Sequence, residues 1–365
     1  MEGKLFILSP LLHLPSGIYP KAKAGTSWVS SSYPRRGDGT NGTIFYVNSC
    51  IMTTKRRFIK PESLLHIYEK GEKGRMLFYV PEDYILYFTL HSCVSRAREV
   101  RTVMFCLMPN HVHSAEMAEN IRIISDTHRD IESRFATEYN LQHKRQGRLF
   151  KKSFGSAIKS IGKRIRENLC YIANNPVAGN ISTGITDYRW NLLAFNGNSH
   201  PFSQDIKIPG RLRRSINLVN EMRRQEKPLG YGVQHTIFKD LNHQEREYLT
   251  DHIISIYNFV EYDTIAGYFG SFENAIITME ANSGSEYDIK EDWEDYSLYR
   301  TMTLICKGLD IDMDTVNFDT VKDSVLRDLA YRFRMAGASE MQIRKFLGRQ
   351  DGTAFASFTA ERTGY

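Results

Sequence analysis

The chain has 365 residues, of which 41% are apolar and 25% charged, a composition that excludes disordered, collagen-like and disulfide-dense proteins. The formal net charge of +6 favours a polyanionic partner. The five cysteines are scattered without a C-x-x-C pair, and no apolar run reaches the roughly 18 residues of a membrane span. We therefore expect a reduced, cytoplasmic protein with no membrane partner.

The predicted elements begin after a poorly structured N-terminal extension, residues 1–62, which is rich in Gly, Ser and Pro and contains at most one strand. Apolar runs and helical periodicity then predict the order β-α-β-β-α-β-α. The strands are expected at 64–71, 101–108, from 111 and over 152–160, and the helices at 81–97, 120–140 and 161–175. This order predicts an α+β domain, residues 63–197, with helices packed on an antiparallel sheet.

The second half of the chain has a different character. Residues 198–230 are predicted to be a basic linker, and residues 231–365 a mainly α-helical region. Within it, residues 318–360 have the pattern of a helix-turn-helix, with a turn at Gly337 and Ser339 as the N-cap of the second helix. An ordinary helical hairpin is the other interpretation of this segment.

Two histidines follow a turn at Pro109 and Asn110. Side chains alternate between the two faces of a strand, so His111 and His113 project to the same side. Two imidazoles on one face can ligate a metal ion, although an H-x-H pair can also arise by chance in a chain with 11 histidines. The pair alone leaves both interpretations open.

The predicted helix 161–175 carries two stripes. One is an apolar ridge expected to pack on the sheet, formed by Ile161, Ile165, Leu169 and Ile172. The other is polar and brings a tyrosine hydroxyl, two amides and a guanidinium to one side: Arg164, Asn168, Tyr171 and Asn175. Pro176 is predicted to end the helix directly after Asn175, which leaves this end accessible.

A basic run lies between His143 and Glu167, with nine Lys and Arg residues and no acid. Phe150 and Phe154 interleave with these charges. The run is either a solvated face or a track for a phosphate backbone. The side chains that we expect on DNA are Arg148, Lys151, Lys152, Lys163, Arg164 and Arg166.

Four segments, in this order and spacing, resemble the single-tyrosine HUH transposases and in particular the REP-associated tyrosine transposases. They are LMPNHVH, GRLFKKSF, YIANNPVAG and DYRW, and the resemblance covers roughly residues 64–197. It implies a ferredoxin-like antiparallel sheet with the histidines on a central strand. It also implies that His111, His113 and Asn175 ligate a divalent metal and that Tyr171 is the nucleophile.

Two features depart from the family pattern. The strand after the histidines is commonly a run of large aliphatic residues, whereas here it reads SAEMAE, residues 114–119. The N-terminal extension and the C-terminal region have no counterpart in the minimal family domain. These departures leave the expected chemistry intact and leave DNA recognition open.

The reaction implied by the resemblance is cleavage and rejoining of a DNA strand through a 5′-phosphotyrosine. A tyrosine hydroxyl has a pKa near 10 and needs activation, and Arg164 is placed to stabilise the developing charge. Two imidazoles and one amide suit Mg²⁺ or Mn²⁺ as the cofactor. Because the covalent link conserves the bond energy, no ATP is required, and the chain has no P-loop.

The expected partner is DNA, as a single strand or a hairpin of the repetitive palindromic kind, and the oligomeric state is open between monomer and homodimer. One alternative is a domesticated or non-catalytic DNA-binding protein of the same fold. A second is a zinc hydrolase, whose metal site also begins with H-x-H. It would need a (β/α)8 barrel, and the strand-poor C-terminal half disfavours it.

Overall fold

The computed structural model describes residues 63–151, 154–283 and 295–349. The predicted N-terminal extension, residues 1–62, and the end of the predicted helix-turn-helix segment, residues 350–360, lie outside the described residues. All described residues belong to one compact unit of the chain.

The strands of the described residues form one four-stranded antiparallel sheet in the order β2-β3-β1-β4. Their bounds are Leu64–Lys70 for β1, Arg101–Met108 for β2, His111–Met117 for β3 and Gly155–Lys159 for β4. The predicted α+β class with an antiparallel sheet is confirmed. The sheet is not the eight-stranded parallel barrel that a zinc hydrolase of the H-x-H kind requires.

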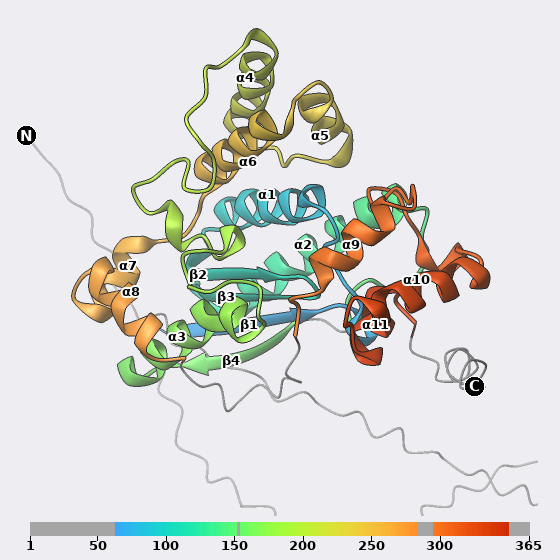
Figure 1. Cartoon of the computed structure of the whole chain (residues 1–365). Coiled ribbons are helices and arrows are strands. Elements are labelled where there is room, and N and C mark those ends of the chain that lie inside the picture. Colours follow the sequence, from blue (N-terminus) through green and yellow to red (C-terminus); the bar gives the residue numbers. More distant parts are fainter. Residues whose placement is uncertain (1–62, 152–153, 284–294, 350–365) are drawn as a thin grey trace, which may run out of the picture. The chain divides into compact units, whose positions relative to one another are not determined.

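Helices cover both faces of the sheet (Figure 1). Helices α1 (Pro81–Ala97) and α2 (Ile121–Gln142) pack on the face that carries Phe105, Leu107 and Val112. Helix α3 (Gly162–Ala178) packs on the opposite face through Ile165, Leu169 and Ile172, against Met104, Cys106 and Ala115. Two apolar cores therefore lie on the two sides of one sheet, and each is interrupted by a group of polar side chains.

Helix α3 differs from the prediction at both ends. Ile161 is the N-cap and is 58% exposed, so the apolar ridge begins at Ile165. Pro176 does not end the helix, which continues to Ala178. A proline in the last turn removes only one backbone donor, and the N–H of Gly179 still donates to the carbonyl of Asn175 at 2.9 Å.

The remaining helices follow the sheet domain in three groups. Helices α4 (Gly210–Arg224), α5 (Tyr231–Phe238) and α6 (His243–Tyr257) form one group, in which α5 and α6 pack on α1 and α4 packs on α5 and α6. Helices α7 (Tyr262–Phe269) and α8 (Phe272–Ala281) lie beside α3. Helices α9 (Tyr299–Lys307), α10 (Asp323–Met335) and α11 (Glu340–Phe346) form the third group. Short 3₁₀ turns span Glu72–Gly74, Arg189–Asn191, Leu193–Phe195 and Phe318–Thr320. The range 198–230, predicted to be a linker, therefore contains helix α4.

The DYRW segment joins the sheet domain to α6. Arg189 donates to Asp251 at 2.9 Å and to Glu247 at 2.8 Å, both on α6. Trp190 stacks on Tyr84 of α1, with ring centroids 4.8 Å apart. The DYRW motif, one of the four segments that carry the family resemblance, therefore connects the chain after α3 to both α1 and α6.

The segment predicted to be a helix-turn-helix has the expected elements. Helices α10 and α11 are separated by a turn containing Gly337, and Ser339 caps α11 by accepting a hydrogen bond from the N–H of Gln342 at 3.3 Å. Phe346 anchors α11 in the core, with rings of Tyr79, Phe333 and other residues around it. Recognition of DNA by α11 stays a prediction. None of the helices in the described ranges has the length and apolar character needed to cross a bilayer.

The buried carboxylate of Asp83 supports two of these helix contacts at once. It accepts hydrogen bonds from the N–H of Tyr79 at 2.8 Å, just before α1, and from the hydroxyl of Tyr231 on α5 at 2.6 Å. We predict that Asp83→Ala lowers the free energy of unfolding by about 3 kcal/mol, because a helix cap and a charged hydrogen bond are lost together. Urea unfolding measures this loss.

Tyr231→Phe is the matched control for Asp83→Ala. It removes only the hydroxyl that meets Asp83, so we expect it to cost about 1 kcal/mol. Equal losses for the two variants would show that the cap of α1 contributes nothing.

Candidate functional site

The face of the sheet that lies under α3 carries a group of aromatic and imidazole rings. In β3 these are His111 and His113, and in the neighbouring strand β1 they are His66 and Tyr68, since residues two apart share a face. The ring of Tyr68 lies 5.7 Å from that of His111 and 5.0 Å from that of His113, between centroids. The two rings of the H-x-H pair are 4.8 Å apart.

Helix α3 adds the tyrosine and the amide that the sequence predicted. The ring of Tyr171 lies 5.7 Å from that of His113 and 5.8 Å from that of His66. Asn175 donates from Nδ2 to the carbonyl of Tyr171 at 2.9 Å, and its side chain lies close enough to His113 to raise the pKa of that imidazole. The structure therefore brings together all four predicted residues, two from β3 and two from α3, and their roles remain predictions.

The orientation of His111 is set by the residue before it. Nδ1 of His111 lies 2.7 Å from Oδ1 of Asn110, whose Nδ2 donates to the carbonyl of Gly74 at 3.2 Å. The hydroxyl of Tyr296 also donates to Oδ1 of Asn110, at 2.8 Å. An amide oxygen only accepts, so Nδ1 of His111 carries the hydrogen, and Nε2 of the neutral ring carries the lone pair that a metal needs.

His113 is held by a chain of two further side chains. Its Nδ1 lies 2.9 Å from Nε2 of His66, and Nδ1 of His66 lies 2.8 Å from the amide of Asn168 on α3. Each neutral imidazole donates from one nitrogen and accepts at the other, so the amide sets the direction of the whole chain. In the structure Nδ2 of Asn168 faces His66, so metal binding at Nε2 of His113 requires this amide to turn over and present its oxygen instead.

The electrostatics of the site keep His113 neutral. Burial lowers the pKa of His113 well below its ordinary value, and His111, His66 and Lys70 lower it further, while the neighbouring side chain of Asn175 acts in the opposite sense. Neutral imidazoles and an amide oxygen are donors that a divalent ion accepts. The donor set of His111, His113 and Asn175 therefore fits the metal that the resemblance implies.

Sequence reasoning missed four residues of this site. The alternation of His66 and Tyr68 in β1 was a signal, because a central strand that pairs with β3 must present these residues beside its histidines. Asn168 stood on the polar stripe but received no role. Tyr296 follows Asn110 by 186 residues and comes from the helical C-terminal half, so no local pattern could have revealed it.

The basic residues predicted to bind DNA lie on the surface. The described ones are exposed: Arg148, Lys151, Lys163, Arg164 and Arg166. Lys152 lies outside the described residues. The N–H of Lys151 donates to the carbonyl of Lys70 at 2.8 Å, which places Lys151 at the end of β1, and Lys70 is the register partner of His111.

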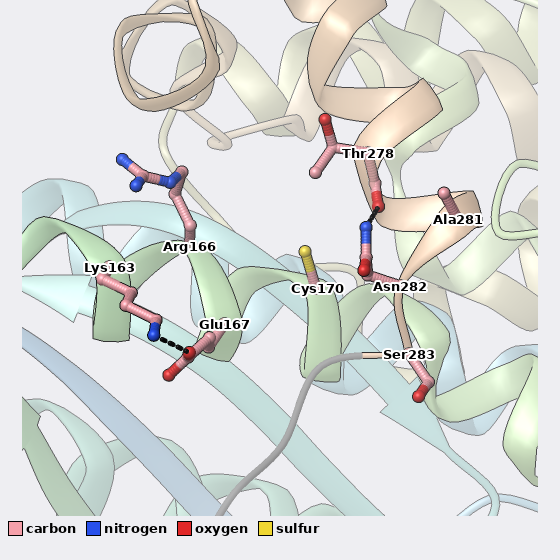
Figure 2. A pocket seen from close by; sticks show the side chains of 8 residues that line it. All are labelled: Lys163, Arg166, Glu167, Cys170, Thr278, Ala281, Asn282 and Ser283. Carbon is pink, nitrogen blue, oxygen red and sulfur yellow. Dashed lines mark hydrogen bonds and ion pairs between the residues drawn. The ribbon is translucent and has the colours of Figure 1, made fainter.

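A groove of about 570 Å³ runs between α3 and α8 (Figure 2), and its lining on α3 includes Cys170, the residue before Tyr171 in the sequence. Lys163 and Arg166 of α3 line one side, and Thr278 and Asn282 line the other. Lys163 also forms a long ion pair with Glu167, at 3.9 Å between Nζ and Oε1. The groove offers cations and amide or hydroxyl groups, which are the donors that a phosphate backbone accepts.

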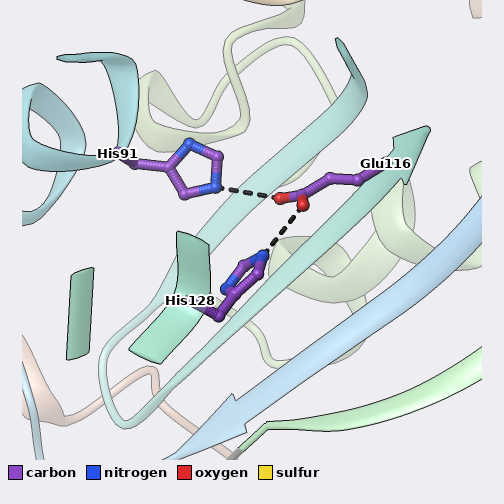
Figure 3. A group of neighbouring side chains, drawn as sticks. All are labelled: His91, Glu116 and His128. Carbon is purple, nitrogen blue, oxygen red and sulfur yellow. Dashed lines mark hydrogen bonds and ion pairs between the residues drawn. The ribbon is translucent and has the colours of Figure 1, made fainter. Parts of the chain in front are cut away.

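A second polar group lies on the other face of the sheet, buried between β3, α1 and α2 (Figure 3). His91, Glu116 and His128 converge there and could hold a metal ion. Although burial by itself raises the pKa of the Glu116 carboxyl, His128 and then His91 hold it well below its ordinary value. Sequence reasoning treated this part of β3 only as a departure from an aliphatic pattern.

No model of a known protein family matches this sequence, and no protein of curated function matches it. Among solved structures, the chain is similar to one described as a REP-associated tyrosine transposase bound to a REP hairpin. The match has 16% sequence identity and a TM-score of 0.34, and it covers 43% of this chain and 94% of the other. So slight a likeness assigns no function, and we infer function from the geometry of the site.

We predict that the amide of Asn168 controls metal affinity through His66 and His113. Asn168→Leu removes the acceptor that fixes the direction of the chain and should weaken Mn²⁺ binding about 10–100-fold, as loss of an outer hydrogen-bond partner typically does. Asn168→Asp presents only acceptor oxygens and should keep the affinity near that of the unchanged protein. Isothermal titration with Mn²⁺ measures both, and an equal loss in the two variants would reduce Asn168 to a packing residue.

Proposed function

We propose that this chain is a single-tyrosine DNA strand transferase of the HUH kind, related to the REP-associated tyrosine transposases. The observation that carries the proposal is the meeting of Tyr171 with His111, His113 and Asn175 on one face of the sheet. These residues come from two elements about sixty residues apart in the chain, and packing of α3 on the sheet brings them together.

The topology of the sheet supports the same proposal. The elements run β1-α1-β2-β3-α2-β4, and the strands lie in the order β2-β3-β1-β4 with antiparallel pairing. This order is what a ferredoxin-like fold requires, and it supports the proposal of such a fold with the two histidines on the central strand β3. We propose that residues 63–197 are the HUH nuclease domain of the chain.

The proposed reaction uses the hydroxyl of Tyr171 as the nucleophile. Its oxygen attacks a backbone phosphorus, the bond from phosphorus to the 3′ oxygen breaks, and the released strand leaves with a 3′-hydroxyl. The other strand end stays attached to Tyr171 as a 5′-phosphotyrosine. A 3′-hydroxyl then attacks the same phosphorus and releases the tyrosine, so two strands are joined with no net change in the number of phosphodiester bonds.

The side chains around Tyr171 have positioning roles in this proposal. Asn175 is tied to the backbone of Tyr171, and His66 packs edge-on to its ring, so the tyrosine is confined beside His113. His111, His113 and Asn175 would hold a Mg²⁺ or Mn²⁺ ion, which supplies Lewis-acid stabilisation of phosphate charge when bound. Arg164 lies two turns before Tyr171 on α3 and is exposed, where a guanidinium can meet the substrate backbone.

The proposed substrate is single-stranded or hairpin DNA lying over α3. The cations of the groove between α3 and α8, Lys163 and Arg166, precede Tyr171 along the helix, and Lys151 lies near the other end of the site. Such contacts to phosphates position a strand without reading its sequence. A DNA-binding protein that keeps the fold without the chemistry is the second candidate, favoured by the exposed basic residues alone.

We predict that the protein forms a covalent adduct with DNA through Tyr171. Incubation with single strands and hairpins drawn from the flanking genomic DNA, in the presence of Mn²⁺, should give a band that survives denaturing electrophoresis. Tyr171→Phe should abolish the adduct and leave DNA binding nearly unchanged, because only a hydroxyl is lost.

Tyr68→Phe is the matched control, since Tyr68 packs against both histidines on the same face of the sheet. It should retain the adduct. An adduct formed by Tyr171→Phe removes this residue from the mechanism, and DNA binding without any adduct in the unchanged protein favours the non-catalytic candidate.

We predict that DNA affinity falls steeply with salt and that the groove residues contribute to the slope. Each single-strand phosphate that is neutralised adds about −0.7 to the slope of log affinity against log salt. The double variant Lys163→Gln with Arg166→Gln should therefore flatten the slope by about 1.4 without changing sequence preference. Fluorescence anisotropy at several salt concentrations measures it.

Arg213→Gln with Arg214→Gln is the charge-matched control on α4. Both arginines are exposed, and α4 packs on the α1 side of the molecule, away from α3. If this control flattens the slope as much as the groove variant, the contribution of Lys163 and Arg166 is only bulk charge.

A further inference from the structure

The buried polar group on the α1 and α2 side of the sheet contains several ionisable side chains, although aromatic rings pack around it. His91, Glu116 and His128 are each 0% exposed, and Glu69 is 1% exposed. Phe105 and Phe259 pack against the ring of His91, with centroids 4.7 Å away, and Phe154 lies 5.2 Å from that of His128. Carboxylates at such a site need cationic partners, because burying an isolated charge is very costly.

In both histidines, Nε2 is the ring atom that faces the carboxylate of Glu116. Nε2 of His91 lies 3.0 Å from Oε1 of Glu116, and Nε2 of His128 lies 2.8 Å from Oε2 (Figure 3). Each side chain comes from a different element: His91 from α1, Glu116 from β3 and His128 from α2. Two nitrogens and a carboxylate that converge in this way form a His₂Glu ligand set.

The other ring nitrogen of each histidine is engaged as it is in metal sites. Nδ1 of His128 lies 2.5 Å from Oε1 of Glu69, and Nδ1 of His91 lies 3.3 Å from the hydroxyl of Ser95. Ligating histidines nearly always donate their second N–H to a carboxylate or another oxygen, which fixes the ligating tautomer. Ser114 donates to Glu116 at 2.8 Å, and Tyr87 donates to Glu69, so the outer oxygens are held as well.

We propose that His91, Glu116 and His128 bind a structural Zn²⁺ ion that fastens α1 and α2 to β3. Two imidazoles and a carboxylate, all buried away from water, are a donor set that suits zinc. The ligand atoms of the three side chains all lie within 4.8 Å of one another, and those of a tetrahedral zinc with bonds of about 2.0–2.1 Å lie about 3.3 Å apart, so the side chains would adjust around the ion. One ion with two charges balances Glu69 and Glu116 and leaves both histidines neutral.

This site is independent of the proposed DNA chemistry. It lies on the opposite face of the sheet from His111 and His113, because Ser114 and Glu116 alternate with them along β3. It also gives a reason for the polar residues at 114 and 116, where the family pattern has large aliphatics. We infer a role in holding the fold and not in cleavage.

The test is the metal content of the full-length protein after dialysis against a chelator. We expect about one zinc per chain to remain, because a fully buried ion exchanges slowly, and replacement by Co²⁺, with a water as the fourth ligand, should give the visible absorption of a four-coordinate ion. His91→Gln should lose the ion. His113→Ala, which removes an imidazole from the other face of the same strand, should retain it.

The measurement on the unchanged protein decides the matter even if His91→Gln does not fold. Folded protein with zinc far below one per chain, and with a melting temperature that zinc does not raise after refolding in chelator, would overturn the proposal. The group would then be an ion network in which protonated His128 bridges Glu69 and Glu116. Zinc retained equally by unchanged protein and His91→Gln would also overturn it.

Discussion

The alternation of side chains along β3 is the constraint on which the rest of the structure depends. His111 and His113 face α3, whereas Ser114 and Glu116 face α1 and α2. A slip of one residue against β1 would exchange the two sets and bury each among the wrong partners. The register is held from both sides, by the contact of His113 with His66 under α3 and by His128 between Glu69 and Glu116 on the opposite face.

The sequence predicted the elements of the sheet domain well, because their periodicity and end signals are local. It failed where the deciding contacts are not local. Pro176 was expected to end α3, but a proline in the last turn costs a single hydrogen bond that packing on the sheet outweighs. Ile161 fits the apolar spacing but lies beyond the edge of the sheet contact and is exposed.

The sequence predicted residues that meet in the candidate site, but not the residues that surround them. Spacing and resemblance led to Tyr171 and the H-x-H pair, which the fold brings together. His66 and Asn168 act through other side chains, so no motif marks them, and Tyr296 reaches Asn110 from a region with no family counterpart. The His91, Glu116 and His128 group escaped notice because its members are single residues of three separate elements.

The contacts of Arg189 with α6 and of Trp190 with α1 limit where this chain can be divided. Asp251 of α6 is fully buried, and Arg189 is its partner. Separating residues 63–197 from the α4–α6 group would therefore expose surface that is now buried on both parts. A fragment that stopped at residue 197 would leave Arg189 without its acidic partners and α1 without its cover. The helical region is therefore not an interchangeable module. A cut at this boundary would expose the buried carboxylate of Asp251 and the face of α1 that α6 covers.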